Sequence, residues 1–363
     1  MNTPKKRSKA SKENFGEGKP TPSNLNVDAI SKIKSSRSVP RSVDYKDLTQ
    51  ELLRGNKMAL ARAISLVESA RSDHHQIANK IIEESLPYGA KSIRIGITGV
   101  PGVGKSTFID GIGSLLTELG HKVAVLAVDP SSSLSKGSIL GDKTRMQNLA
   151  KDPNAYIRPT PTGNSLGGVA SKTRESIVLC EAAGFNIIWI ETVGVGQSEI
   201  AVHQMVDFFL LLQLPGAGDE LQGIKRGIVE MADAIAINKA DAERLPMAKR
   251  AKMEYSRALH LYPPKENGWV PKVLLCSAQE NTGIMEVWEM IVKYIGETTE
   301  NGHFLSKRKE QNRYWFLQAF EEGLNRKMQE NSVVKEQKEK LLQEVMESRM
   351  SPLKAAEKLL KLI

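Results

Sequence analysis

Residues 99–107 read Gly99-Val100-Pro101-Gly102-Val103-Gly104-Lys105-Ser106-Thr107. This run matches the pattern G-x-x-x-x-G-K-[ST], in which glycines let backbone N–H groups converge on a phosphate. The apolar run Ile93–Thr98 precedes it, and a helical pattern from Lys105 to Leu119 follows it, so the helix N-terminus adds a dipole that favours anions. We expect Lys105 to reach the β and γ phosphates of a nucleotide and the Ser106 hydroxyl to bind Mg²⁺. The loop alone does not distinguish ATP from GTP.

Further apolar runs surround this loop and indicate the fold class. They are Val123–Val128, Ile187–Ile190, Phe208–Leu214, Ala234–Ile237 and Val273–Cys276. The runs are continuous rather than alternating, as expected for strands that are covered on both faces. Helical stretches lie between most of them. The order predicts an α/β fold of the P-loop NTPase type, with a mainly parallel central sheet flanked by helices.

The run Ala234–Ile237 ends in a second motif, Asn238-Lys239-Ala240-Asp241. Ligands bind at the carboxyl ends of the strands in such sheets. Guanine presents a ring N–H beside an exocyclic amine, and the Asp241 carboxylate can accept both, whereas adenine offers no such pair. Asn238 can bridge the base and the neighbouring loops, and the Lys239 stem can lie over the ring. The next predicted strand ends at Ser277-Ala278, where a backbone N–H can meet the guanine carbonyl oxygen. We therefore predict a GTP site.

Three acids are expected where the γ-phosphate should lie: Asp129 and Glu191, which end the predicted strands Val123–Val128 and Ile187–Ile190, and Asp142, in the segment Gly141–Arg145. Carboxylates in such positions can hold Mg²⁺ or orient the attacking water. We predict Lys105, Asp129, Glu191 and Gly194 as catalytic groups, with the Gly194 N–H facing the γ-phosphate. Ser106 and the three acids are the predicted metal ligands. The residues do not decide which acid does which task, and Asp142 can instead cap a helix.

Charge is unevenly distributed along the chain. Residues 1–41 hold ten lysines and arginines and three acids, so they carry +7 of the formal charge of +9. Because the basicity lies in a tail rather than on a binding face, we expect residues 1–42 to be a disordered basic tail and we expect no nucleic-acid partner. Residues 43–90 have a helical pattern and form a predicted N-terminal extension, residues 91–297 the P-loop GTPase domain, and residues 298–363 a helical arm. The apolar faces of that arm either fold back on the core or pair with a second chain, and we favour dimerisation.

The composition also bears on the compartment. The two cysteines, Cys180 and Cys276, each lie in an apolar run without a CxxC partner, which is typical of reduced buried thiols. No run of about 18 apolar residues occurs, so we expect no membrane segment. We expect a cytoplasmic protein; a mitochondrial presequence between Lys5 and Arg41 is the alternative.

Several longer segments resemble the MeaB/ArgK family of P-loop GTPases, the family that includes the methylmalonic aciduria type A protein. Besides the two nucleotide motifs they are Val128-Asp129-Pro130-Ser131-Ser132, residues 140–146, residues 163–170 and the string from Trp189 to Glu199. The resemblance covers about residues 45–363. It implies a homodimeric chaperone for an adenosylcobalamin-dependent acyl-CoA mutase, usually methylmalonyl-CoA mutase, that uses GTP to gate cofactor delivery and to protect or reactivate the mutase.

The resemblance also implies roles for particular residues. The Asp129 and Asp142 segments belong to nucleotide-responsive regions in that family, and Glu191 is the signature acid near magnesium. The loop from Leu214 to Lys225 is similar to an additional switch that signals to the mutase, and its polar positions are Asp219, Gln222 and Lys225. Mg²⁺ and GTP or GDP are the implied ligands, and no tightly bound cobalamin is expected on this chain.

Three other functions are compatible with a P-loop. A metal-insertion GTPase for nickel or zinc enzymes needs imidazole or thiolate ligands, but His74-His75 is the only histidine pair. An ATP-dependent kinase of an amino-acid transport system is disfavoured by Asn238–Asp241. A nucleic-acid GTPase is disfavoured because the positive charge is confined to the tail. No arginine finger is evident, with Arg145 and Arg174 as the only candidates.

Overall fold

The computed structural model of the 363-residue chain describes residues 44–69, 71–89, 91–128, 145–159, 166–192, 198–216 and 226–362. The predicted basic tail, residues 1–42, therefore lies outside the described residues. Residues Tyr45–Ile363 form one compact unit. Within the described ranges, no helix is both long and apolar enough to cross a membrane.

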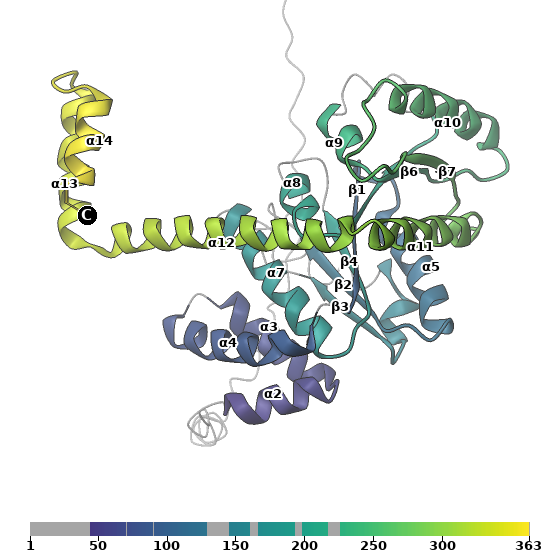
Figure 1. Ribbon diagram of the computed structural model, residues 1–363, viewed down its shortest axis with the longest axis horizontal. Helices are drawn as coiled ribbons and strands as arrows, with labels where there is room; N and C mark the ends of the chain where they lie inside the picture. The colour runs from purple at the N-terminus through teal and green to yellow at the C-terminus, as the bar shows by residue number, and fades with distance from the viewer. Residues whose placement is uncertain are drawn as a thin grey trace, which may run out of the picture. The chain divides into compact units, whose positions relative to one another are not determined.

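A parallel sheet of seven strands lies at the centre of this unit (Figure 1), in the order β3-β2-β4-β1-β5-β6-β7. The strands are β1 (Ile93–Gly99), β2 (Val123–Val128), β3 (Ala155–Pro159), β4 (Ile187–Thr192), β5 (Phe208–Gln213), β6 (Ala234–Ile237) and β7 (Lys272–Leu275). All six pairings are parallel. The predicted α/β fold with a mainly parallel sheet is thus confirmed. The phosphate loop follows β1, which lies between β4 and β5.

Strand β3 was not predicted from the sequence. It lies at the edge of the sheet and pairs with β2 alone. Its segment, Ala-Tyr-Ile-Arg-Pro, interrupts the apolar run with Arg158 and ends in Pro159, and only Ala155 and Ile157 are fully buried. An edge strand has one neighbour and a partly solvated face, so the continuous apolar pattern that marks the other strands is absent here.

Helices cover both faces of the sheet. Helices α5 (Lys105–Glu118) and α11 (Ile284–Glu300) pack on one face, and α7 (Leu166–Ala182) and α8 (Ser198–His203) on the other (Figure 1). On β1, Ile95 and Ile97 belong to the core shared with α5 and α11. Gly96 faces α8, where an added Cβ would lie 3.0 Å from Val202 Cγ1 and 2.8 Å from Phe209 Cδ2. A larger residue at Gly96 would therefore push α8 away from the sheet.

Three helices and a short 3-10 turn precede β1: α2 (Tyr45–Leu53), α3 (Lys57–Glu68), α4 (Ser72–Ser85) and η1 (Leu86–Tyr88). Helices α3 and α4 pack on α7. Polar contacts also tie α3 to the edge of the sheet: Arg158 pairs with Glu68, and the Lys57 Nζ donates to the backbone oxygen of Ala155 at 2.6 Å. The segment is helical as its pattern indicated, while its boundary at residues 43–90 stays a prediction.

The remaining helices lie in the second half of the chain. They are η3 (Leu149–Lys151) before β3, α9 (Arg226–Met231), α10 (Leu245–Leu259), α12 (His303–Glu330), α13 (Ser332–Met346) and α14 (Pro352–Leu360). The last helix begins as its sequence indicates, because Ser351 Oγ accepts from the Lys354 N–H at 3.3 Å and Pro352 occupies the first turn. Helix α13 packs on α12 and α14.

The first turns of α12 are bound to the core by side chains. Arg308 forms two 2.8 Å hydrogen bonds with the Asp207 carboxylate and one of 2.6 Å with the Ser92 carbonyl oxygen. Lys307, Gln311 and Trp315 donate to the backbone oxygens of Asp207, Val206 and Gln204. Farther along the helix, Phe316 and Phe320 stack on each other while 67% and 56% exposed. The aromatic side chains of this part of α12 thus lie on two sides of the helix, with Trp315 toward the core and Phe316 and Phe320 toward solvent.

Candidate nucleotide site

The phosphate loop joins β1 to α5 through glycines in the left-handed region. Gly102 has a φ of 79° and Gly104 a φ of 96°, conformations that favour glycine. At Gly104 space is limiting as well, because an added Cβ would lie 2.8 Å from Asn238 Nδ2. The same loop is also closed by a hydrogen bond from the Val103 N–H to the Val100 oxygen at 3.2 Å. The sequence therefore builds a loop whose backbone can approach an anion closely.

Lys105, the first residue of α5, folds back over this loop. Its Nζ donates to the Gly99 carbonyl oxygen at 2.8 Å and to that of Val100 at 3.4 Å, and the residue is only 8% exposed. Burial lowers the pKa of the Lys105 ammonium, and the nearby carboxylates of Glu191 and Glu199 oppose that shift. A partly desolvated cation at the start of α5 is well suited to hold a polyphosphate.

Ser106 and Glu191, two of the predicted metal ligands, lie together. Ser106 Oγ donates to Glu191 Oε1 at 3.0 Å, and the residues are 9% and 5% exposed. A hydroxyl and a carboxylate are the hard oxygen ligands that Mg²⁺ accepts, so the residues present fit the ion. The other predicted groups, Asp129, Asp142 and Gly194, lie outside the described residues. Among the described residues, no group of three His, Cys, Asp or Glu is placed to hold a metal ion.

The guanine motif follows β6 and contacts the phosphate loop directly. Asn238 Nδ2 donates to the Val103 oxygen at 2.8 Å, and Lys239 Nζ donates to the Gly102 oxygen at 2.8 Å. Lys239 has a φ of 57°, a conformation that is uncommon for a residue other than glycine. Two motifs that are far apart in the sequence therefore meet at the same edge of the sheet, as a single nucleotide requires.

The segment after β7 positions the guanine motif. Ser277 Oγ donates to Asp241 Oδ1 at 2.5 Å and so orients this carboxylate. The Ala278 N–H donates to Asn238 Oδ1 at 3.0 Å, and the Ser277 N–H donates to the Thr282 oxygen at 2.9 Å. Both N–H groups at Ser277-Ala278, one of which we expected to face guanine, are thus engaged within the protein in this structure. The contact of Ala278 with the base stays a prediction.

A cavity of about 480 Å³ opens beside these residues. It lies between α5 and the segment after β7, and both Thr107 and Ala278 line it. Asp110 also lines it and accepts hydrogen bonds from the Leu149 N–H at 2.8 Å and from Asn148 Nδ2 at 3.1 Å. Space for a ligand is therefore present next to the predicted base contacts.

Sequence reasoning missed two contributions to this site. Ser277 was chosen for its backbone, but its hydroxyl contacts Asp241. Glu199, in the first turn of α8, is only 1% exposed and its charge acts on Lys105. No spacing rule singles out an acid in a helix after a strand, so only packing could show that Glu199 lies near the phosphate lysine. Asp219, Gln222 and Lys225, which the resemblance predicts to signal to a partner, lie outside the described residues.

Comparison with known proteins places this geometry in a family. The family model described as "Methylmalonyl Co-A mutase-associated GTPase MeaB" matches residues 60–333. A probable GTPase of Mycobacterium tuberculosis is 48% identical over 308 residues, covering 85% of this chain and 92% of the relative. The mouse protein named methylmalonic aciduria type A homolog, mitochondrial, is 44% identical over 320 residues, covering 85% and 77%.

A further relative and a solved structure agree with these matches. The Escherichia coli protein named GTPase ArgK is 45% identical over 273 residues, covering 75% of this chain and 82% of the relative. A crystal structure titled LAO/AO transport system kinase is 35% identical and superimposes with a TM-score of 0.71, covering 90% of this chain and 99% of the other. The chain described here therefore belongs to the MeaB family and is a P-loop GTPase.

Proposed function

We propose that this GTPase gates the delivery of adenosylcobalamin to an acyl-CoA mutase, methylmalonyl-CoA mutase above all, and protects or reactivates that enzyme. The nucleotide part of the proposal is supported by the hydrogen bond from Asn238 Nδ2 to the Val103 oxygen at 2.8 Å, which joins the base motif to the phosphate loop. The mutase part is supported by the family description and by the name of the mouse relative.

Recognition of GTP begins at the base. The Asp241 carboxylate, oriented by Ser277, accepts the two adjacent N–H donors of guanine, and the Lys239 stem lies along the ring. Asn238 holds the base loop and the phosphate loop at a fixed separation. Because adenine lacks the paired donors, this arrangement gives GTP an advantage over ATP.

Hydrolysis takes place at the other end of the nucleotide. Water attacks the γ phosphorus, the bond from that phosphorus to the bridging oxygen breaks, and GDP and phosphate leave. Lys105 compensates negative charge on the β and γ phosphates, and Glu191 with Asp129 orients the water. Ser106 and the acids Glu191, Asp129 and Asp142 would hold Mg²⁺, which when bound would supply additional positive charge to the phosphates. We assign the Gly194 N–H, on the sequence motif, to the γ-phosphate.

The exposed apolar residues of the C-terminal helices support assembly with a second copy. Besides the stacked pair Phe316 and Phe320 on α12, Leu353 on α14 is 73% exposed. We infer a homodimer formed largely through residues 298–363. We infer further that the loop carrying Asp219, Gln222 and Lys225 communicates with the mutase. We also infer that neither nucleic acid nor a membrane is a partner and that this chain does not hold cobalamin tightly. The protein is inferred to act in the cytoplasm.

The test is GTP turnover by the purified full chain with Mg²⁺, measured with and without methylmalonyl-CoA mutase. We expect slow turnover by the chain alone and faster turnover with the mutase, because the sequence motifs show no obvious arginine finger. An unrelated acyl-CoA enzyme at the same concentration is the control. Turnover that the mutase leaves unchanged would remove the chaperone proposal and leave the GTPase intact. ATP binding as tight as GTP binding would instead favour the transport-kinase alternative.

The variant Lys225→Ala tests the signalling loop. It should bind GTP with unchanged affinity, because Lys225 belongs to neither nucleotide motif, and it should lose most of the acceleration by the mutase. Lys249→Ala, an exposed lysine on α10, is the matched control and should behave as the unmodified chain. Full acceleration of Lys225→Ala would place the signal elsewhere.

A further inference from the structure

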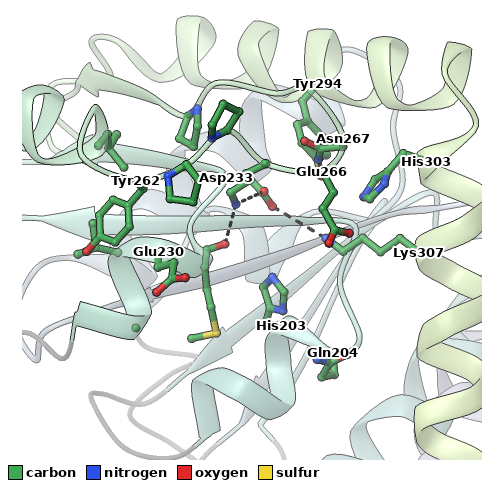
Figure 2. Close-up of a pocket in the computed structure, with 18 of the residues that line it drawn as sticks. His203, Gln204, Glu230, Asp233, Tyr262, Glu266, Asn267, Tyr294, His303 and Lys307 are labelled. Carbon is green, nitrogen blue, oxygen red and sulfur yellow. Dashed lines mark hydrogen bonds and ion pairs between the residues drawn. The ribbon is translucent and has the colours of Figure 1, made fainter.

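A second cavity, of about 760 Å³, lies at the opposite edge of the sheet from the nucleotide site (Figure 2). Its residues Asp233 and His203 come before β6 and β5, whereas Lys105 and Asn238 follow β1 and β6. Because all strands of a parallel sheet run in the same direction, the starts of the strands lie along one side of the sheet and the ends of the strands along the opposite side. The walls come from α8, α9, the segment 259–271 and the first turns of α12. A volume of this size suits a small organic ligand.

Charged groups are fixed on one side of this cavity. Asp233, only 2% exposed, accepts from Lys265 Nζ at 2.7 Å and from the Phe209 N–H at 2.9 Å, and it lies 4.0 Å from Lys307 Nζ. Figure 2 shows Lys307 reaching toward Asp233 above His203. Lys265 also donates to the Met231 oxygen and Lys307 to that of Asp207. Two ammonium groups therefore face one buried carboxylate, and these three groups together carry a charge of +1.

Each ammonium keeps hydrogen-bonding capacity toward the cavity. A lysine has three N–H donors. Among the described residues Lys265 uses two of them and Lys307 one, apart from its longer ion pair. The backbone and carboxylate contacts fix the position of both side chains. Together they form a preorganised site for a single negative charge.

Gln311 adds an acceptor that no described residue uses. Its Nε2 donates to the Val206 oxygen at 2.8 Å, which fixes the orientation of the amide, and its Oε1 is buried without a hydrogen-bond partner. The residue is 4% exposed and lines the cavity. A buried carbonyl oxygen without a donor is costly, so a ligand that carries an N–H or O–H group would be stabilised here.

His203 supplies a neutral polar wall between these groups. Burial, and next the charge of Lys307, lower the pKa of its imidazole to about 4. The ring is therefore uncharged at physiological pH and adds no positive charge to those of Lys265 and Lys307. It offers one donor and one acceptor, and its edge packs on Phe209.

The rim excludes some classes of ligand. Glu230, Glu266 and Glu310 line the cavity and are exposed, so the approach carries three negative charges. A polyanion such as a nucleotide or coenzyme A is repelled there, whereas a monoanion is tolerated. Proline and aliphatic side chains, including Pro263, Pro264 and Ile200, give part of the wall an apolar surface.

We propose that this cavity binds a small organic molecule that has a single carboxylate and a hydrogen-bond donor on the neighbouring carbon, as α-hydroxy acids and amino acids do. The carboxylate lies against Lys265 and Lys307, the hydroxyl or ammonium group donates to Gln311 Oε1, and the organic body lies along the prolines. Because His203 belongs to α8 and Gln311 to α12, such a ligand also bridges these two helices. The site is separate from GTP hydrolysis and goes beyond the function proposed above.

Calorimetric titration of the full chain with a matched set of acids tests this assignment. The probes are 3-phenyllactate, phenylalanine and 3-phenylpropionate, which share a carboxylate and a phenyl group. The carbon next to the carboxylate carries a hydroxyl, an ammonium group or neither, so 3-phenyllactate and 3-phenylpropionate are matched in charge and phenylalanine is a zwitterion. We expect at least one donor-bearing probe to bind about tenfold more tightly than 3-phenylpropionate, as one additional hydrogen bond allows. Absence of measurable binding by all three, or equal binding by all three, would overturn the proposal.

Two variants assign the binding to named groups. Gln311→Leu should remove the advantage of the donor-bearing probe and leave 3-phenylpropionate binding unchanged. Lys307→Met should weaken every probe by at least tenfold. Retention of GTP affinity shows that each variant is folded. Equal weakening of all probes by Gln311→Leu, or unchanged binding in Lys307→Met, would contradict the assigned geometry, and sulfate that displaces the probes at equal concentration would show a nonspecific anion site.

Discussion

Gly104 is the residue at which the two halves of the nucleotide site come closest. Its φ of 96° already favours glycine, and the adjacent Asn238 amide leaves no space for a methyl group. The side chain of Asn238 in turn contacts the phosphate loop and the segment after β7. A change at Gly104 therefore acts on the base loop as well as on the phosphate loop.

We predict that Gly104→Ala reduces the free energy of unfolding by about 1–3 kcal/mol through backbone strain, and also strongly weakens GTP binding. The matched control is Gly120→Ala, because Gly120 has a φ of 87° but no atom within 4 Å of an added Cβ. That control should lose similar stability and keep its GTP affinity. Urea unfolding and nucleotide titration measure the two effects. Equal GTP affinity in both variants would show that the contact with Asn238 is unimportant.

Asp241 carries the predicted preference for guanine. Asp241→Ala removes two charge-assisted hydrogen bonds, so GTP binding should weaken by about 3–6 kcal/mol, at roughly 1.5–3 kcal/mol for each bond. ATP binding should change little. Titration of the unmodified chain and the variant with GTP and ATP measures both. A loss that is equal for the two nucleotides would mean that Asp241 acts on the fold rather than on the base.

At the scale of single residues, the sequence was informative about those functional groups that belong to a motif with a fixed spacing. The places of Lys105 after β1 and of Asn238 after β6 could be expected because each motif follows a continuous apolar run. The hydroxyl of Ser277 and the carboxylate of Glu199 could not, since their roles depend on which loop or helix packs beside them. Short motifs specify their own residues and not the neighbours that orient them.

At the scale of elements, the same contrast separates β3 from the six strands that the apolar runs predicted, edge strand β7 among them. Strands β1, β2, β4, β5 and β6 are apolar throughout or nearly so, because helices cover both sides, and each was predicted. Edge strand β3 was missed because Arg158 leaves the sheet to pair with Glu68 on α3. Arg158 has its partner on a separate helix, and the position of that helix does not follow from the periodicity of the strand's own sequence.

Helix α12 is attached to the core by a buried ion pair. The contribution of this pair to the free energy of unfolding can be measured. Arg308→Met leaves the Asp207 carboxylate, which is 1% exposed, without its main partner. Loss of one member of a buried pair typically costs about 3–5 kcal/mol. Urea unfolding should show a loss of this size. Arg250→Met breaks an exposed pair with Glu254 and should cost about 0–1 kcal/mol. Comparable losses in the two variants would mean that Arg308 does not anchor the helix.

At the scale of the whole molecule, the stacked phenylalanines of α12 predict association. The double variant Phe316→Asp with Phe320→Asp should convert a dimer to a monomer in size-exclusion chromatography with light scattering, because it places four carboxylates in a symmetric contact. Its melting as a monomer should not change, since both side chains are exposed. Leu261→Asp, at a position 87% exposed outside the C-terminal helices, is the control and should stay dimeric. A dimer that survives the double variant would place the interface elsewhere.

The length of α12 has a mechanical consequence. This helix comprises 28 residues, which corresponds to about 42 Å at a rise of 1.5 Å per residue. Only its beginning is hydrogen-bonded to the connection between α8 and β5, and that connection leads back toward Glu191 through α8. The 15 residues after Trp315 extend about 22 Å beyond the last of these hydrogen bonds, so a tilt of about 5° at the held part would displace the end of the helix by about 2 Å. A small rotation of α8 would therefore become a larger displacement at the far end of α12.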